Sequence, residues 1–144
     1  MAIEGQQQPD GAPVPAARFT DVVALNLRAL AHFRDHGPGV QVLSDTGAAR
    51  TVLFCFKPGQ HLKEHQTSSQ IQVQVLRGHI GFEAARATFE GRAGTLFQVE
   101  AQVPHSIIAK TTAIVLVTMT PSPLHHSLEH EVFDSLTPLV RHAE

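Results

Sequence analysis

Residues 59–78 read GQHLKEHQTSSQIQVQVLRG, and residues 94–105 read GTLFQVEAQVPH. In the first segment, glutamines at 70, 72 and 74 alternate with aliphatic residues at 71, 73 and 75. Successive side chains of a β-strand point to opposite faces, so the glutamines share one face and the aliphatic residues share the other. We therefore predict a strand with its aliphatic face in a core and its glutamine face toward solvent or a partner subunit.

Short runs of β-type residues, separated by turn residues such as Pro58-Gly59 and Gly91, continue on both sides of this strand. Such regular short strands are typical of a closed or two-sheet all-β domain, for example a jelly roll. No helical stretch lies between the runs, which argues against alternating βα units. The predicted strands are 40–43, 51–57, 61–65, 71–77, 79–83, 87–90, 95–99, 106–110 and 112–120.

The two quoted segments resemble the paired motifs of the cupin family. The first family motif is Gly, five residues, His-x-His, three or four residues, Glu, six residues, Gly. Gly59, His65 and Gly78 match it. Thr67 stands where the second histidine would be, and Ile71 stands where the glutamate would be.

The second family motif is Gly, five residues, Pro-x-Gly, two residues, His, three residues, Asn. Here Gly94 and His105 match, while Glu100, Gln102 and Ala109 replace the other signature residues. The resemblance covers residues 40–120 and implies a cupin-type jelly-roll β-barrel, also called a double-stranded β-helix. It also implies a homodimer, and a metal site that in complete cupins uses three histidines and one carboxylate.

Two of the metal-ligand positions implied by the resemblance keep their histidine, His65 and His105. His61 is a third candidate ligand, because it lies four residues before His65 and points the same way if the strand is regular. The metal would be divalent: zinc, iron, nickel or manganese. Two histidines rarely hold a metal tightly. One alternative is therefore a metal-free polar pocket around His65 and His105, with His61 in solvent.

Thr67, Ile71, Phe54 and Phe56 are the further residues that we expect to line the pocket. All aromatic residues other than histidine are phenylalanine, so the pocket would be apolar and would suit a partly hydrophobic small molecule. Three functions stay open: a metal-binding cupin whose enzymatic activity is undecided, a metal-free binding or sensing module for small molecules, and a purely structural barrel filled by its own side chains.

The composition argues against two classes of partner, nucleic acid and anionic membranes. The chain has 144 residues and a formal net charge of −2, so no basic excess attracts nucleic acid or an anionic membrane. Cys55 is the single cysteine, lies in an apolar run and excludes an intrachain disulfide, which indicates the cytoplasm. No apolar run is long enough to span a membrane, and the N-terminus does not resemble a signal peptide.

The two ends of the chain differ from the middle. Residues 1–17 carry few apolar side chains and predict a flexible tail before a single domain over 18–144. Apolar residues three and four apart predict a helix over 18–36, capped by Thr20 or Asp21, and a second helix over 124–144. The segment His126-Ser127-Leu128-Glu129-His130 fits a zinc-peptidase pattern, but its place in a short terminal helix argues against that function.

Overall fold

The computed structural model describes residues 16–18 and 21–123 of the chain. These residues belong to two compact units, one ending at His32 and the other beginning at Phe33. We describe each unit by itself. The predicted tail, apart from its last two residues, and the predicted helix over 124–144 lie outside the described residues, as does the His126–His130 segment.

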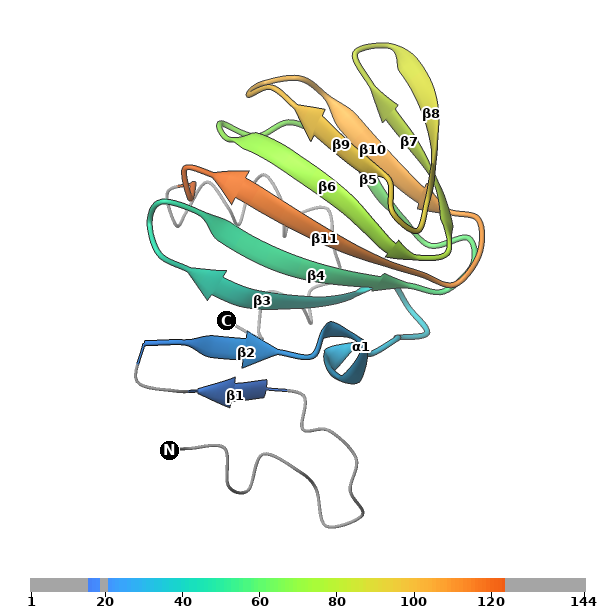
Figure 1. Ribbon diagram of the computed structural model, residues 1–144. Helices are drawn as coiled ribbons and strands as arrows, with labels where there is room; N and C mark the ends of the chain where they lie inside the picture. Colours follow the sequence, from blue (N-terminus) through green and yellow to red (C-terminus); the bar gives the residue numbers. More distant parts are fainter. Residues whose placement is uncertain (1–15, 19–20, 124–144) are drawn as a thin grey trace. The chain divides into compact units, whose positions relative to one another are not determined.

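The second unit contains two antiparallel sheets, drawn from cyan to orange in Figure 1. The larger sheet has the strand order β3-β4-β11-β6-β9, and the smaller sheet has the order β5-β10-β7-β8. The strands of the larger sheet are β3 (Gly39–Asp45), β4 (Arg50–Phe56), β6 (Gln70–Arg77), β9 (Leu96–Val99) and β11 (Ala113–Thr120). Those of the smaller sheet are β5 (His61–His65), β7 (His79–Ala84), β8 (Ala87–Arg92) and β10 (His105–Ala109).

All nine strands predicted in this region are present, with ends that differ by a few residues at most. In β6, β10 and β11, buried residues alternate with more exposed ones, so that each of these strands contributes one inward face. In β6 the side chains of Ile71, Val73 and Val75 are buried, while Gln72 and Gln74 are exposed. The glutamine row therefore lies on the outer face, where the Gln72 side-chain amide donates a hydrogen bond of 3.1 Å to Gln98 on β9.

The inward faces of both sheets share one apolar core. The larger sheet contributes Phe54, Phe56 and Val115 to it, and the smaller sheet contributes Ile80 and Phe82. These five side chains are no more than 2% exposed. This packing fixes the two sheets as the walls of one barrel, and any internal site must lie in the space that these side chains leave open.

The predicted N-terminal helix over 18–36 is wrong in its extent. The first unit has two short paired strands, β1 (Ala16–Arg18) and β2 (Val23–Leu25), and a four-residue helix, α1 (Leu27–Leu30). The Asn26 side chain accepts a hydrogen bond from the backbone N–H of Ala29 and caps this helix, in place of the predicted Thr20 or Asp21. β-branched residues favour a strand, and the strand pairing overrides the helical spacing.

Candidate functional site

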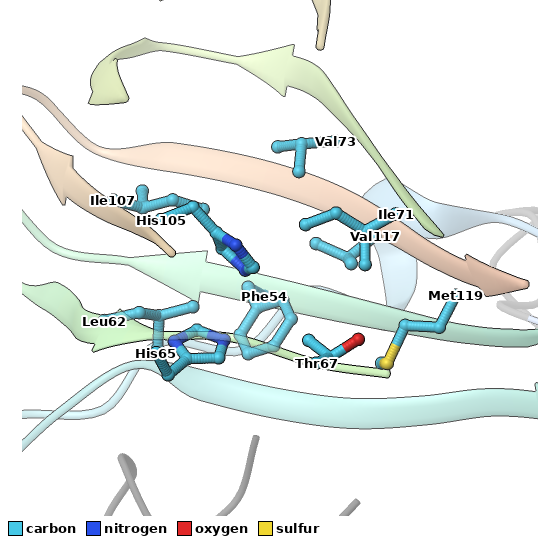
Figure 2. Close-up of a pocket in the computed structure, with 10 residues that line it drawn as sticks. All are labelled: Phe54, Leu62, His65, Thr67, Ile71, Val73, His105, Ile107, Val117 and Met119. Carbon is cyan, nitrogen blue, oxygen red and sulfur yellow. The ribbon is translucent and has the colours of Figure 1, made fainter. Parts of the chain in front are cut away.

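His65 and His105 lie side by side at one end of the barrel interior. They occupy adjacent antiparallel strands, β5 and β10, and are direct partners in the strand register. Their ring centroids are 4.5 Å apart, and the rings meet edge to face at 63°. Figure 2 shows both rings beside Phe54 in the cavity. The two positions that match the cupin histidines are therefore brought together.

Backbone hydrogen bonds set the tautomer of both imidazoles. The Nδ1 atom of His65 is 2.8 Å from the carbonyl oxygen of Lys63, and Nδ1 of His105 is 2.9 Å from that of Val103. A carbonyl oxygen can only accept, so each Nδ1 must carry the proton. In the neutral form of each ring, Nε2 is then the nitrogen with the lone pair.

His105 is neutral at physiological pH. Its side chain is 5% exposed. Burial, with a smaller contribution from the charge of nearby His65, lowers the pKa of His105 from 6.5 to about 4, although the hydrogen bond to Val103 acts in the opposite direction. A buried imidazole that stays unprotonated offers a hydrogen-bond acceptor rather than a charge.

A small, mostly apolar cavity surrounds the histidine pair. The centres of water molecules have about 20 Å³ available in it, which is room for one or two waters. With the open space at its mouth, the hollow comprises about 350 Å³. Apolar side chains from both sheets fill the rest of this part of the barrel. The lining residues are Phe54, Leu62, His65, Thr67, Ile71, Val73, His105, Ile107, Val117 and Met119.

Five of the seven predicted site residues line this cavity: His65, His105, Thr67, Ile71 and Phe54. Phe56 is fully buried in the core and does not line it. Valine, isoleucine and methionine residues of β10 and β11 that the pocket prediction omitted also line it. Their alternation along each strand was the available signal, because every second residue of β11 from Ala113 to Met119 is buried.

His61 does not join the pair, because the strand is not regular there, and its side chain faces solvent as the alternative interpretation had it. Its side chain is exposed, whereas its neighbour Leu62 is 4% exposed and lines the cavity. The register explains the reversal: β10 advances two residues from His105 to Ile107, while β5 advances three from His65 to Leu62. The extra residue is a β-bulge, which shifts the alternation of faces by one.

Solved structures of known proteins share this architecture. An RmlC-like cupin protein from Desulfovibrio desulfuricans is 26% identical, with a TM-score of 0.60 over 64% of this chain and 90% of that one. A cupin superfamily protein from Desulfitobacterium hafniense is 16% identical, with a TM-score of 0.63 over 80% of this chain and 94% of that one. This protein has the fold of a small cupin-like barrel.

Another similar structure is a double-stranded β-helix protein from Klebsiella pneumoniae, which is 16% identical with a TM-score of 0.63 over 68% of this chain and 89% of that one. Neither a protein-family model nor a curated protein sequence matches the chain. In the part of the chain that the structure describes, no helix is long and apolar enough to cross a membrane.

The side chains of this cupin-like barrel do not fit a tightly held divalent metal. Among residues 16–18 and 21–123, no group of three or more His, Cys, Asp or Glu side chains could hold one. The Thr67 hydroxyl is engaged in its own loop, since it donates to the Ser69 carbonyl at 3.2 Å and accepts from the Ser69 amide at 2.8 Å. Ile71 has no ligand atom, so two imidazoles remain where three or four ligands are usual.

Proposed function

We propose that this cupin binds a small molecule at the His65–His105 pair without a resident divalent metal. The observation that carries the proposal is a buried neutral imidazole beside a second imidazole in an otherwise apolar cavity. The Nε2 lone pair of neutral His105 is an acceptor for a hydroxyl or N–H group of a ligand. A buried acceptor of this kind discriminates strongly against ligands that lack the donor.

The size of the cavity restricts the ligand further. Space for one or two waters admits a polar group of about one or two heavy atoms. The body of the ligand would lie at the mouth, against the half-buried ring of His65. Because Leu62, Phe54 and Ile107 surround the histidines, this body should be apolar or aromatic. Small alcohols, phenols and amides satisfy both requirements.

The first experiment compares metal content with ligand binding. Elemental analysis of untagged, chelator-free protein should find metal far below one equivalent, also after reconstitution with zinc, iron, nickel and manganese. Ligand-observed NMR with a panel of small alcohols, phenols and amides should then detect binders whose affinity falls about tenfold or more in His105→Leu. His61→Ala is the matched control and should bind like the wild type, because His61 lies outside the cavity.

Two outcomes would overturn the proposal. Near-stoichiometric metal that is lost in both His65→Ala and His105→Ala would establish a reduced-ligand metal site instead. If the folded, metal-free protein bound none of these compounds, the remaining interpretation would be a structural barrel that is filled by its own side chains.

A further inference from the structure

Two neighbouring strands of the larger sheet bury apolar side chains on both of their faces. Every second residue of β4 from Val52 to Phe56 belongs to the core, so Leu53 and Cys55, which lie between them, point to the outer face. On β11, Ile114 is the register partner of Cys55 and points the same way. Leu53, Cys55 and Ile114 are no more than 2% exposed. We call these three side chains the outer cluster.

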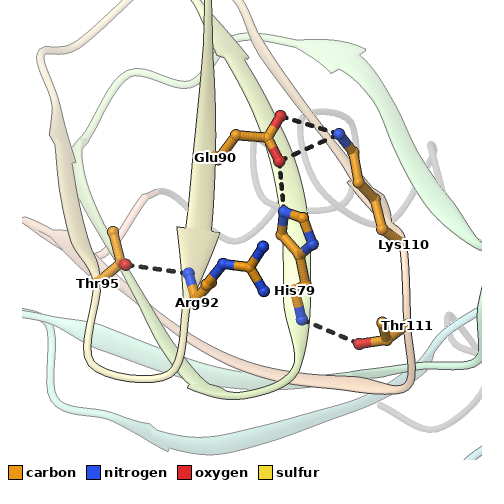
Figure 3. A network of polar contacts seen from close by, with 6 residues as sticks. All are labelled: His79, Glu90, Arg92, Thr95, Lys110 and Thr111. Carbon is orange, nitrogen blue, oxygen red and sulfur yellow. Dashed lines mark hydrogen bonds and ion pairs between the residues drawn. The ribbon is translucent and has the colours of Figure 1, made fainter.

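Other outer faces of the two sheets are open to solvent. On β6, next to β11, the outward side chain of Gln72 is exposed. On the smaller sheet, Ile108 is 48% exposed. Figure 3 shows the carboxylate of Glu90 between Lys110 and His79 on that sheet, and Lys110 donates to its two oxygens at 2.9 and 3.1 Å. The burial of the outer cluster is therefore local and requires a cover over β4 and β11.

The described helices and strands do not supply this cover. Between Phe33 and Pro123 the chain has no helix, and all of its strands belong to the two sheets. A segment that seals an apolar face buries its own apolar side chains on that face. None of residues 21–32 is buried. This leaves the two ends of the chain, residues 1–20 and 124–144, as candidates for the cover.

The position at which β11 ends favours residues 124–144. The backbone N–H of Ser122 donates a hydrogen bond of 3.0 Å to the carbonyl oxygen of Gly47 in the turn between β3 and β4. The chain is therefore held at the Thr120 end of β11, roughly 20 Å along the strand from Ile114. A helix of about 14 residues spans this distance, so residues 124–144 are long enough to return over β4 and β11.

The apolar pattern of the sequence also favours this end of the chain. Residues 1–20 have only four large apolar side chains, which are Met1, Ile3, Val14 and Phe19. In residues 124–144, apolar side chains recur every four residues, which describes one face of a helix. They are Leu128, Val132, Leu136 and Val140. Such an apolar row gains free energy when it is removed from water together with the outer cluster.

We propose that residues 124–144 dock as a helix on the outer face of β4 and β11 and cover the outer cluster. The row from Leu128 to Val140 contacts Leu53, Cys55 and Ile114. The site is intramolecular, so the cover is in place at every protein concentration.

Cys55 is the single cysteine of the chain and reports directly on this cover. Mass spectrometry follows its alkylation by iodoacetamide in the full chain, which should be slow in the wild type because the cover must first open. Leu136→Lys places a charge in the apolar row and should speed the labelling about tenfold or more. Ser135→Lys is the matched control. It adds the same side chain one residue outside the row and should label like the wild type.

Urea distinguishes opening of the cover from unfolding of the sheet. Opening of the cover exposes little surface, so the labelling rate of Leu136→Lys should hardly change with urea below the unfolding transition. A rate that rises steeply with urea would mean that Cys55 is reached only through global unfolding, and this result would overturn the proposal. Far-ultraviolet circular dichroism should show that both lysine variants keep the strand content of the wild type.

Three other results would also contradict the proposal. Leu136→Lys could label no faster than Ser135→Lys, which would mean that the apolar row does not contact the sheet. Leu27→Lys in α1 could speed the labelling while Leu136→Lys does not, which would assign the cover to the first unit. Labelling of the wild type could slow as the protein concentration rises, which would assign the cover to a second copy of the chain.

Discussion

His65 and His105 are direct partners across β5 and β10, with ring centroids 4.5 Å apart, immediately beside the bulge of β5. The bulge allows both Leu62 and His65 to face the cavity although three positions separate them. Strand pairing and the backbone hydrogen bonds to both Nδ1 atoms fix the rings before any ligand arrives. The pair is therefore preorganised, which lowers the entropic cost of binding.

The burial of His105 predicts a stability change at mildly acidic pH. In the unfolded chain this imidazole takes up a proton near pH 6.5, whereas in the folded chain its pKa is about 4. The unfolded state thus binds more protons between these values, so the free energy of unfolding falls as the pH falls through this window. The loss should amount to roughly 3 kcal/mol and should be absent from His105→Leu.

Urea unfolding at several pH values, followed by far-ultraviolet circular dichroism because the chain has no Trp or Tyr, measures this difference. His61→Leu serves as the control and should keep the pH dependence of the wild type. The carboxyl pKa values of Asp45 and Glu90 are lowered in the folded chain from 3.8 and 4.5, so these groups contribute only at the acidic end of the window and below it, and equally in all variants. Parallel pH curves for the wild type and His105→Leu would show that His105 titrates normally.

The β5 bulge predicts that truncation of Leu62 lowers the free energy of unfolding, whereas truncation of its neighbour His61 hardly changes it. Leu62→Ala removes a side chain that is 4% exposed and should lower the free energy of unfolding by about 2–4 kcal/mol. His61→Ala changes an exposed side chain and should stay within about 0.5 kcal/mol of the wild type. Urea unfolding of both variants distinguishes this arrangement from a regular strand, which would reverse the two results.

The sequence allowed the strands and the histidine pair to be predicted, and the reason is physical. A two-residue alternation such as that from Gln70 to Val75 is a direct consequence of strand geometry. The orientation of His61 could not be predicted in this way, because the extra residue of the bulge in β5 is not accompanied by a recognisable sequence pattern. The bulge becomes visible only when β5 is paired with β10.

The size of the cavity could not be predicted from the sequence either. Phe54 and Ile71 were expected in a pocket, but only packing shows that Val117 and Met119 from β11 complete its wall and reduce its volume. At the N-terminus, the three- and four-residue spacing of apolar residues indicated a helix. There the exposed side chains of Val22 and Val23 gain little from a helical face, since they are 57% and 50% exposed.

Alanine substitution at two glycines of the paired motifs should destabilise the protein to different extents. Gly78 has φ of +87°, and a Cβ atom there would lie 2.0 Å from the carbonyl oxygen of Thr112. Gly94 has φ of +99°, but a Cβ atom there would meet nothing within 4 Å. Gly94→Ala should therefore cost about 1–2 kcal/mol, from the left-handed backbone alone.

Gly78→Ala adds a clash with backbone and should cost more than about 3 kcal/mol or prevent folding. Thermal unfolding of both variants under identical conditions provides the comparison. Equal melting temperatures would contradict the close approach of the β6–β7 turn to the segment before β11.

The residues that line the cavity also indicate which two substitutions would create a metal site in this barrel. The side chains of Thr67 and Ile71 line the same cavity as His65 and His105. The double variant Thr67→His/Ile71→Glu should supply four converging ligands and bind about one equivalent of zinc. Without metal it should be several kcal/mol less stable than the wild type, because a carboxylate is buried without a partner. Added zinc should recover part of this loss.

Elemental analysis and the zinc dependence of the melting temperature measure the outcome. The matched control is Thr67→His/Gln72→Glu, which places the carboxylate one residue further along β6, on the exposed outer face. Because successive residues of a strand face opposite sides, this control introduces the same two side chains and loses the fourth ligand. Equal zinc affinity in both double variants would mean that position 71 does not face the histidine pair in solution.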